Sequence, residues 1–227
     1  MRSPRFDVDG AQLRRGLANP HLDELLEFFA STSVGPGTRI ADAGSLEFIC
    51  GPDSAVGTAV RDLIGSRARV VRAIAFDKSP ETNWALGWHQ DRTICVKRRA
   101  TISGYGPWTL KQGLHHVQPP FAITAGMVTV RVHLDPVTPD NAPLKIALGT
   151  HQLGQIADAD AHSVAKRHAT THCYAQPGDV WFYSTPILHA SDRSRASGRR
   201  RVLQLDFSAD DLPSPLQWLL ESQTVPT

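Results

Sequence analysis

From about residue 67 almost to the C-terminus, the chain is a succession of short β-branched runs bounded by Gly, Pro and Asp. Runs of this kind are typical of strands, whose side chains alternate between two faces. We expect about eight strands, near residues 69–76, 87–96, 123–134, 144–148, 170–175, 179–183, 186–190 and 201–208. Many short strands of this spacing pack as two facing antiparallel sheets.

The first third of the sequence has a different pattern. Apolar residues recur at helical spacing from Leu13 to Phe29, and a second helix is predicted from Asp53 to Ile64 with Asp53 as its N-cap. We therefore expect one domain over residues 1–227, mainly β with N-terminal helices. A mostly helical part (1–66) would cover a core (67–210) that is a double-stranded β-helix, a cupin-like jelly roll.

Two long segments without a strand pattern interrupt the predicted core. Residues 98–120 are rich in Gly and Pro, and residues 152–167 are polar. Loops of this length in a compact domain are usually functional. Because the first segment contains Trp108, which a closed loop can bury, we predict that it forms a lid over the site.

Composition restricts the partners and the location of the protein. The 227 residues are 41% hydrophobic and 20% charged, with a formal net charge of +2. That charge gives no basis for nucleic-acid binding, and no apolar run reaches the roughly 18 residues of a membrane helix. Three distant cysteines and an N-terminus without an apolar run favour a reduced, cytoplasmic protein. We expect a monomer or homodimer that acts on a small molecule.

The sharpest chemical signal is the WHQD motif at residues 88–91, at the start of a predicted strand. Residues two apart on a strand project to the same side, so His89 and Asp91 can both reach one metal ion. His189, in a later apolar strand, is the best candidate for a third ligand. Two imidazoles and one carboxylate leave coordination positions open, as in non-haem Fe(II) oxygenases, whereas structural zinc sites are closed by four ligands.

In this order the motifs resemble those of the phytanoyl-CoA dioxygenase family of Fe(II)/2-oxoglutarate oxygenases. The resemblance runs from about residue 72 to residue 207 and rests on WHQD (88–91), DN (140–141), GTHQLG (149–154), PGD (177–179), LHAS (188–191) and GRRRVLQLDF (198–207). The segment FDKSPETNWALGWHQD is similar to small bacterial members. The resemblance implies that His89, Asp91 and His189 are catalytic and bind Fe(II). It also implies that 2-oxoglutarate and O₂ are consumed, a substrate C–H bond is hydroxylated, and succinate and CO₂ are released.

The resemblance further implies an arginine that holds the distal carboxylate of 2-oxoglutarate. The family places it about eleven residues after the second histidine, which selects Arg200, and a planar guanidinium suits a carboxylate. Strand alternation leaves an alternative open. If the apolar face of the strand at 201–208 packs on the helices, Arg200 points into the barrel. If that face lines the barrel, Arg201 does.

Other polar residues are candidates for the same cofactor site. Ser191 stands where the family often has a hydroxyl against this carboxylate, although it can also be a simple turn residue. Thr129 and Arg131 share the polar face of a predicted barrel strand, and the family more often has an aromatic residue at the position of Arg131. Three readings stay open for Arg131: a contact with 2-oxoglutarate, a contact with an acidic substrate group, or a surface position.

The sequence indicates the residues that bind the substrate less clearly than those that bind iron and 2-oxoglutarate. Candidates for substrate binding are Lys78, Asn83, Trp84 and Trp108. Two other functions stay open: a jelly-roll binding module without turnover, and a cupin-like metalloenzyme that does not use 2-oxoglutarate. Asp91 argues against a related halogenase, in which chloride takes the place of the carboxylate.

Overall fold

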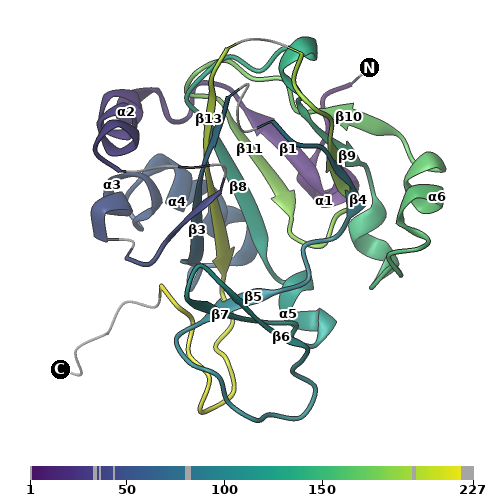
Figure 1. Ribbon diagram of the computed structural model, residues 1–227. Helices are drawn as coiled ribbons and strands as arrows, with labels where there is room; N and C mark the ends of the chain where they lie inside the picture. Colours follow the sequence, from purple (N-terminus) through teal and green to yellow (C-terminus); the bar gives the residue numbers. More distant parts are fainter. Residues whose placement is uncertain are drawn as a thin grey trace.

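The structure, a computed structural model, describes residues 2–32, 35, 37–42, 44–79, 83–195 and 198–220. Two antiparallel sheets face each other, and helices cover the outer face of the larger sheet (Figure 1). This arrangement confirms the predicted fold class, a mainly β jelly roll with N-terminal helices. No helix in the described part of the chain is long and apolar enough to span a membrane.

The larger sheet has six strands among the described residues, and all of its pairings are antiparallel. In spatial order they are β1 (Ala11–Arg14), β11 (Val180–Ser184), β8 (Val128–His133), β13 (Arg200–Ser208), β3 (Arg69–Lys78) and β2 (Thr38–Ile40). The central strands are rich in β-branched residues, which pack well on a pleated surface.

Two further sheets complete the β structure. The smaller sheet of the sandwich has the order β10 (Thr170–His172), β9 (Leu144–Ala147), β12 (His189–Ser191) and β4 (Leu86–His89). A third sheet, with the order β5 (Ile94–Val96), β7 (Leu114–Val117) and β6 (Trp108–Lys111), lies at one end of the sandwich near α5 (Phe121–Ala125) (Figure 1).

The helices that cover the larger sheet are α2, α3 and α4 (Figure 1). The described helices are α1 (Phe6–Asp9), η1 (Asn19–His21), α2 (Leu22–Ser31), η2 (Gly44–Leu46), α3 (Glu47–Cys50), α4 (Ala55–Ile64), η4 (Pro139–Asn141), η5 (Thr150–Leu153) and α6 (Ala161–Lys166), besides α5. Apolar side chains of α2 and α4, among them Leu25, Phe29 and Val60, pack on the sheet. Full burial of such a side chain stabilises the fold by about 1.5–3 kcal/mol.

This packing decides which face of each central strand lines the interior of the jelly roll. The valines of β8 and the apolar residues Leu203, Leu205 and Phe207 of β13 belong to the core under the helices. Alternation then directs the other face of both strands, which is polar, toward the smaller sheet. The interior between the sheets is therefore lined with polar and charged groups at this place.

The N-terminal third differs from the prediction in two respects. Residues around Leu13, predicted to be helical, form the edge strand β1, and residues 38–40 form the opposite edge strand β2. Both become strands by pairing with longer strands of the sheet, a tertiary effect that overrides local preference. Helix α4 is capped by Ser54 rather than Asp53, because the Ser54 hydroxyl accepts a hydrogen bond of 2.9 Å from the amide of Gly57.

The strand predicted at 87–96 is two strands in different sheets, β4 and β5. The chain leaves the smaller sheet at Gln90, whose side-chain amide donates to the carbonyls of Pro186 and Gly154 and accepts from the amide of Ile156. These bonds fix the bend between the strands. Asp91 therefore lies just after β4 instead of on it.

Other boundaries also differ from the prediction. The segment 98–120, predicted to contain no strands, contains the β6–β7 hairpin. The strand predicted at 123–134 begins with helix α5, and β8 starts only at Val128. Helix α6 forms part of the segment 152–167, and the strands predicted at 170–175 and 186–190 are shorter.

Candidate active site

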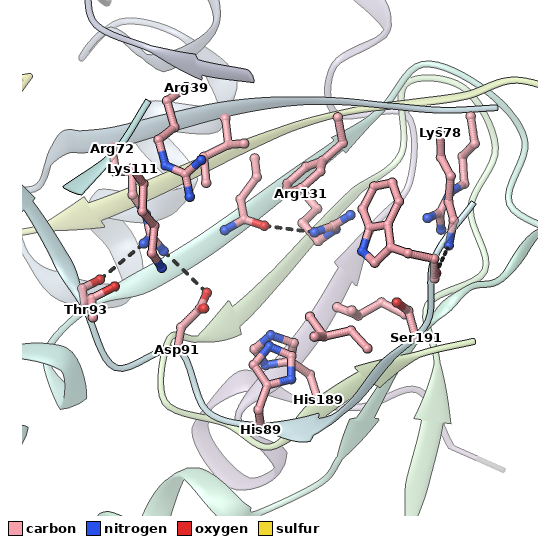
Figure 2. A pocket seen from close by; sticks show the side chains of 17 residues that line it. Arg39, Arg72, Lys78, His89, Asp91, Thr93, Lys111, Arg131, His189 and Ser191 are labelled. Carbon is pink, nitrogen blue, oxygen red and sulfur yellow. Dashed lines mark hydrogen bonds and ion pairs between the residues drawn. The ribbon is translucent and has the colours of Figure 1, made fainter. Parts of the chain in front are cut away.

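Two histidines face each other across the smaller sheet. His89 ends β4, His189 begins β12, and they are register partners whose ring centroids lie 4.2 Å apart (Figure 2). Each ring bonds through Nδ1 to the carbonyl oxygen of the residue two positions earlier, at 2.7 Å to Gly87 and at 2.9 Å to Ile187. Because a carbonyl only accepts, both Nδ1 atoms carry a proton, and in the neutral form of each ring Nε2 keeps the lone pair that can bind a metal.

Asp91 brings a carboxylate to the same place. Within the described residues, His89, Asp91 and His189 are the one group of at least three His, Cys, Asp or Glu side chains close enough to share an ion, with ligand atoms within 4.8 Å of one another. Burial acts to raise the pKa of Asp91, but Arg72 and the two imidazoles lower it, and the pKa ends below its ordinary value. The carboxylate is therefore ionised at neutral pH.

Arg72, on β3, forms an ion pair with this carboxylate. Its Nη2 lies 3.3 Å from Asp91 Oδ2, and its Nη1 donates to the carbonyl of Thr93 at 3.2 Å. Its Nε forms a close ion pair with Asp206 of β13, which is completely buried. Neither Arg72 nor Asp206 was predicted from the sequence to belong to the site. The available signal was a charged residue inside an otherwise apolar strand, in VVRAIAF and LQLDF.

A cavity of about 200 Å³ lies between the two sheets, beside these three groups. The larger sheet contributes one wall and the smaller sheet, with both histidines, the other (Figure 2). Most of its charged lining is cationic: Arg39, Arg72, Lys78, Lys111, Arg131 and Arg200. The interior is thus built to hold negative charge.

Of the two arginines that strand alternation left open, Arg200 lies in the cavity and Arg201 does not. Arg200 is 8% exposed, and its Nη1 donates to the carbonyl of Ala142 at 2.6 Å, while its Nε has no partner among the described residues. Burial and the neighbouring Arg131 lower the pKa of Arg200 to about 10. Arg201 instead forms a bidentate ion pair with Asp135, at 2.7 and 3.0 Å.

The other candidates for cofactor binding are distributed unevenly. Ser191 and Arg131 line the cavity. Arg131 is buried, donates to Gln204 Oε1 at 2.8 Å and lies 5.2 Å from the centre of the Phe76 ring, so it has no surface position. Thr129 is completely buried and bonds to the hydroxyl of Thr185 at 3.0 Å, outside the cavity lining.

The four substrate candidates also separate. Lys78 and Trp84 line the cavity, and the Lys78 ammonium donates to the Trp84 carbonyl at 2.7 Å. Asn83 bonds through its side chain to the backbone of Ser194 and lies outside the lining. Trp108 packs against the small core of the third sheet, away from the cavity.

Two cationic cavity residues, Arg39 and Lys111, were missed. Arg39 lies on β2, which the sequence did not predict, and Lys111 ends β6 within the segment expected to be a lid without strands. No local pattern marks either residue, because the fold alone brings these two distant segments together.

The sequence model of the phytanoyl-CoA dioxygenase (PhyH) family matches residues 48–202, more than half of the chain. This chain belongs to the phytanoyl-CoA dioxygenase family. It is therefore a 2-oxoglutarate-dependent oxygenase, with Fe(II) as cofactor and 2-oxoglutarate and O₂ as co-substrates. No curated protein sequence matches the chain.

Several solved structures share the fold at low sequence identity. HygX from Streptomyces hygroscopicus, with nickel, 2-oxoglutarate and hygromycin B bound, is 15% identical, with a TM-score of 0.61 over 89% of this chain and 84% of its own. EctD from S. alaskensis with bound Fe is 16% identical, with a TM-score of 0.60 over 92% and 77%. The 2-oxoglutarate-dependent epimerase SnoN of nogalamycin biosynthesis is 14% identical, with a TM-score of 0.62 over 93% and 88%.

Proposed function

We propose that this oxygenase hydroxylates a C–H bond of a small-molecule metabolite and releases succinate and CO₂. The observation that carries the proposal is the convergence of His89, Asp91 and His189 at the wall of a cavity that also contains Arg200. In our proposal the three converging residues bind iron and Arg200 binds 2-oxoglutarate. We also propose that the enzyme is cytoplasmic and acts as a monomer or homodimer.

The donor set fits Fe(II). Two imidazoles, whose Nδ1 atoms bond to backbone carbonyls, offer their Nε2 atoms and Asp91 offers an anionic oxygen, while no fourth His, Cys, Asp or Glu of the described chain joins the group. A three-donor set leaves room for a bidentate co-substrate and O₂, which a closed zinc site does not. When bound, the iron would activate O₂ for oxidation of the substrate. The backbone bonds of the two rings and the contact of Arg72 with Asp91 would keep the three ligands oriented toward the ion.

Arg200 is the residue that we propose for the distal carboxylate of 2-oxoglutarate. It is buried in the cavity, and no carboxylate of the described residues pairs with it. A guanidinium with a free edge can bind a carboxylate through two parallel hydrogen bonds. Ser191 lines the same cavity and can add a hydroxyl donor. Together these groups would orient the oxo acid toward the histidines.

The apolar part of the lining gives the cavity a second role. Ile74 and Phe76 of β3 lie on one wall, and Leu86 and Leu144 lie on the wall of the smaller sheet. Apolar walls exclude water, which strengthens the electrostatic contacts inside and limits side reactions. A small-molecule substrate is supported by the small size of the cavity and by the complex of HygX with hygromycin B.

The test is an anaerobic titration of the purified protein with Fe(II) and then 2-oxoglutarate, followed by visible absorption. We expect a weak charge-transfer band in the wild type and none in Asp91→Ala, which lacks the carboxylate ligand. His172→Ala, which removes an exposed histidine outside the cavity, is the matched control and should keep the band. A wild type without the band, or Asp91→Ala with an undiminished band, would contradict the proposal. Release of succinate in air then reports turnover.

A further inference from the structure

We propose that the substrate of this enzyme is an acid, and that Arg39 and Lys111 bind its carboxylate or phosphate group. This inference rests on the proposed function, because it takes Arg200 as the 2-oxoglutarate site. Figure 2 shows Arg39 and Lys111 at one end of the cavity and Lys78 and Ser191 at the other, with the histidines between them. Arg200 belongs to the second end, since it is the register partner of Lys78.

The first argument is the charge of the cavity. Its lining contains six cationic side chains and one carboxylate, Asp91. Arg72 is compensated, because it pairs with both Asp91 and the buried Asp206. The described residues supply no carboxylate partner for the other five cations, which are Arg39, Lys78, Lys111, Arg131 and Arg200. Bound 2-oxoglutarate carries only two negative charges, and bound Fe(II) would add positive charge. All of these cations except Lys111 are at least partly buried, and such a cation is unfavourable without a counter-charge, so a further anion would stabilise the cavity.

The second argument is the environment of Arg39. Its Nε donates to His116 Nε2 at 3.3 Å. That imidazole is neutral at physiological pH, because burial lowers the pKa of His116 to about 4. The neutral ring therefore orients the guanidinium without compensating its charge. The terminal nitrogens of Arg39 have no partner within the described part of the chain.

The third argument is that two like charges are held together by the fold. Gln112 follows Lys111 in the hairpin turn, and its side-chain oxygen accepts from the backbone amide of Arg39 at 2.9 Å. Its side-chain nitrogen donates to the carbonyl of Gly37 at 3.0 Å. The β6–β7 turn is thus tied to β2, and Lys111 is kept beside Arg39 and Arg72. Repelling cations fixed in this way form an anion site, because a bound anion relieves the repulsion.

This placement determines the class of substrate. The acid group would lie at the Arg39 end, and 2-oxoglutarate at the Arg200 end, so the C–H bond to be oxidised would lie between them, beside the histidines. A carboxylate and a phosphate both satisfy a guanidinium and an ammonium at once. A neutral substrate would leave both cations unpaired.

The test is calorimetric titration of the Fe(II)- and 2-oxoglutarate-loaded protein, without O₂, with inorganic phosphate and, separately, with acetate. The variant is Arg39→Gln/Lys111→Gln, and the matched control is Lys166→Gln/Arg167→Gln, which removes the same charge from the exposed end of α6. We expect the wild type and the control to bind at least one of the two probes. The pocket variant should bind it roughly tenfold more weakly or worse, with unchanged affinity for 2-oxoglutarate. The stronger of the two probes identifies the acid group.

Three outcomes would overturn the inference. The wild type binds neither probe, the pocket variant binds as tightly as the control, or the pocket variant loses affinity for 2-oxoglutarate. In the last case Arg39 and Lys111 hold the co-substrate. A wild type that gives no charge-transfer band contradicts the proposed function instead, and the same titration of the metal-free variants still tests the anion site. The single variant Lys111→Gln, at an exposed side chain, serves if the double variant does not fold.

Discussion

The Asp91 carboxylate lies 3.3 Å from the guanidinium of Arg72. Arg72 is on the larger sheet, whereas the two histidines that converge with Asp91 are on the smaller sheet. The contact therefore links Asp91 to the larger sheet, which is the wall of the cavity opposite the two histidines. Asp206 completes the arrangement, because it neutralises Arg72 from within the larger sheet.

The first prediction concerns this contact. The double variant Arg72→Gln/Asp206→Asn replaces the buried Arg72–Asp206 ion pair by amides, so neither of these two positions keeps an unpaired charge, and Asp91, whose side chain is 26% exposed, loses its cationic support. We expect a folded protein that binds Co(II) or Fe(II) about 10–100-fold more weakly, because the Asp91 carboxylate is no longer held in one orientation. Anaerobic metal titration measures this. Wild-type affinity in the double variant would show that Asp91 needs no support from Arg72.

The second prediction separates the two neighbouring arginines of β13. Arg200→Ala should weaken 2-oxoglutarate binding by roughly 100-fold, since a charged hydrogen-bonding group is lost from inside the cavity. Arg201→Ala should leave that affinity unchanged and cost up to about 1 kcal/mol of stability, because its ion pair with Asp135 is partly exposed. Titration of the metal-loaded proteins with 2-oxoglutarate decides the matter. Equal losses in both variants would exclude Arg200 as the specific clamp.

This pair of arginines also shows how much of the site could be predicted from the sequence. The alternation of apolar and polar residues predicted the strand β13. The apolar residues on one of its faces also indicated that this face packs against another layer of the protein. Alternation alone left both arginines open, since it does not say which layer covers the apolar face. The structure resolves this, because α2 and α4 pack on that face and Arg200 turns inward. The missing information was which layer packs on the apolar face, and this is a tertiary contact.

The parts that the sequence did not predict depend on distant pairing. The strand β2 has only three residues and is a strand because it pairs with β3. The β6–β7 hairpin lies in a Gly-rich and Pro-rich segment, where turn residues obscured two short strands. Arg39 and Lys111 were missed for the same reason. Their proximity is created by the contact of Gln112 with β2, which no local pattern encodes.

The third prediction is a pH dependence. Burial and the cations Arg200 and Arg131 lower the pKa of Lys78 to about 8. As the pH rises through this value, the free protein loses one positive charge at the Arg200 end of the cavity. Affinity for 2-oxoglutarate should then fall, by at most about tenfold per pH unit. In Lys78→Met the affinity should be lower at pH 7 and almost independent of pH from 7 to 9. Parallel pH profiles of the two proteins would rule out Lys78 as the cause.

The fourth prediction concerns the third sheet, which carries Lys111. Trp218 is completely buried in the core of this sheet, and its indole nitrogen donates to the carbonyl of Asp210 at 2.9 Å. Trp218→Ala should lower the free energy of unfolding by about 3–5 kcal/mol, because it removes a large buried side chain and leaves a cavity. Leu110→Ala is the control on the same sheet. Leu110 is 65% exposed, so this change should cost less than about 0.5 kcal/mol. Urea unfolding measures both, and a Trp218→Ala variant as stable as Leu110→Ala would show that the C-terminal segment does not anchor the sheet.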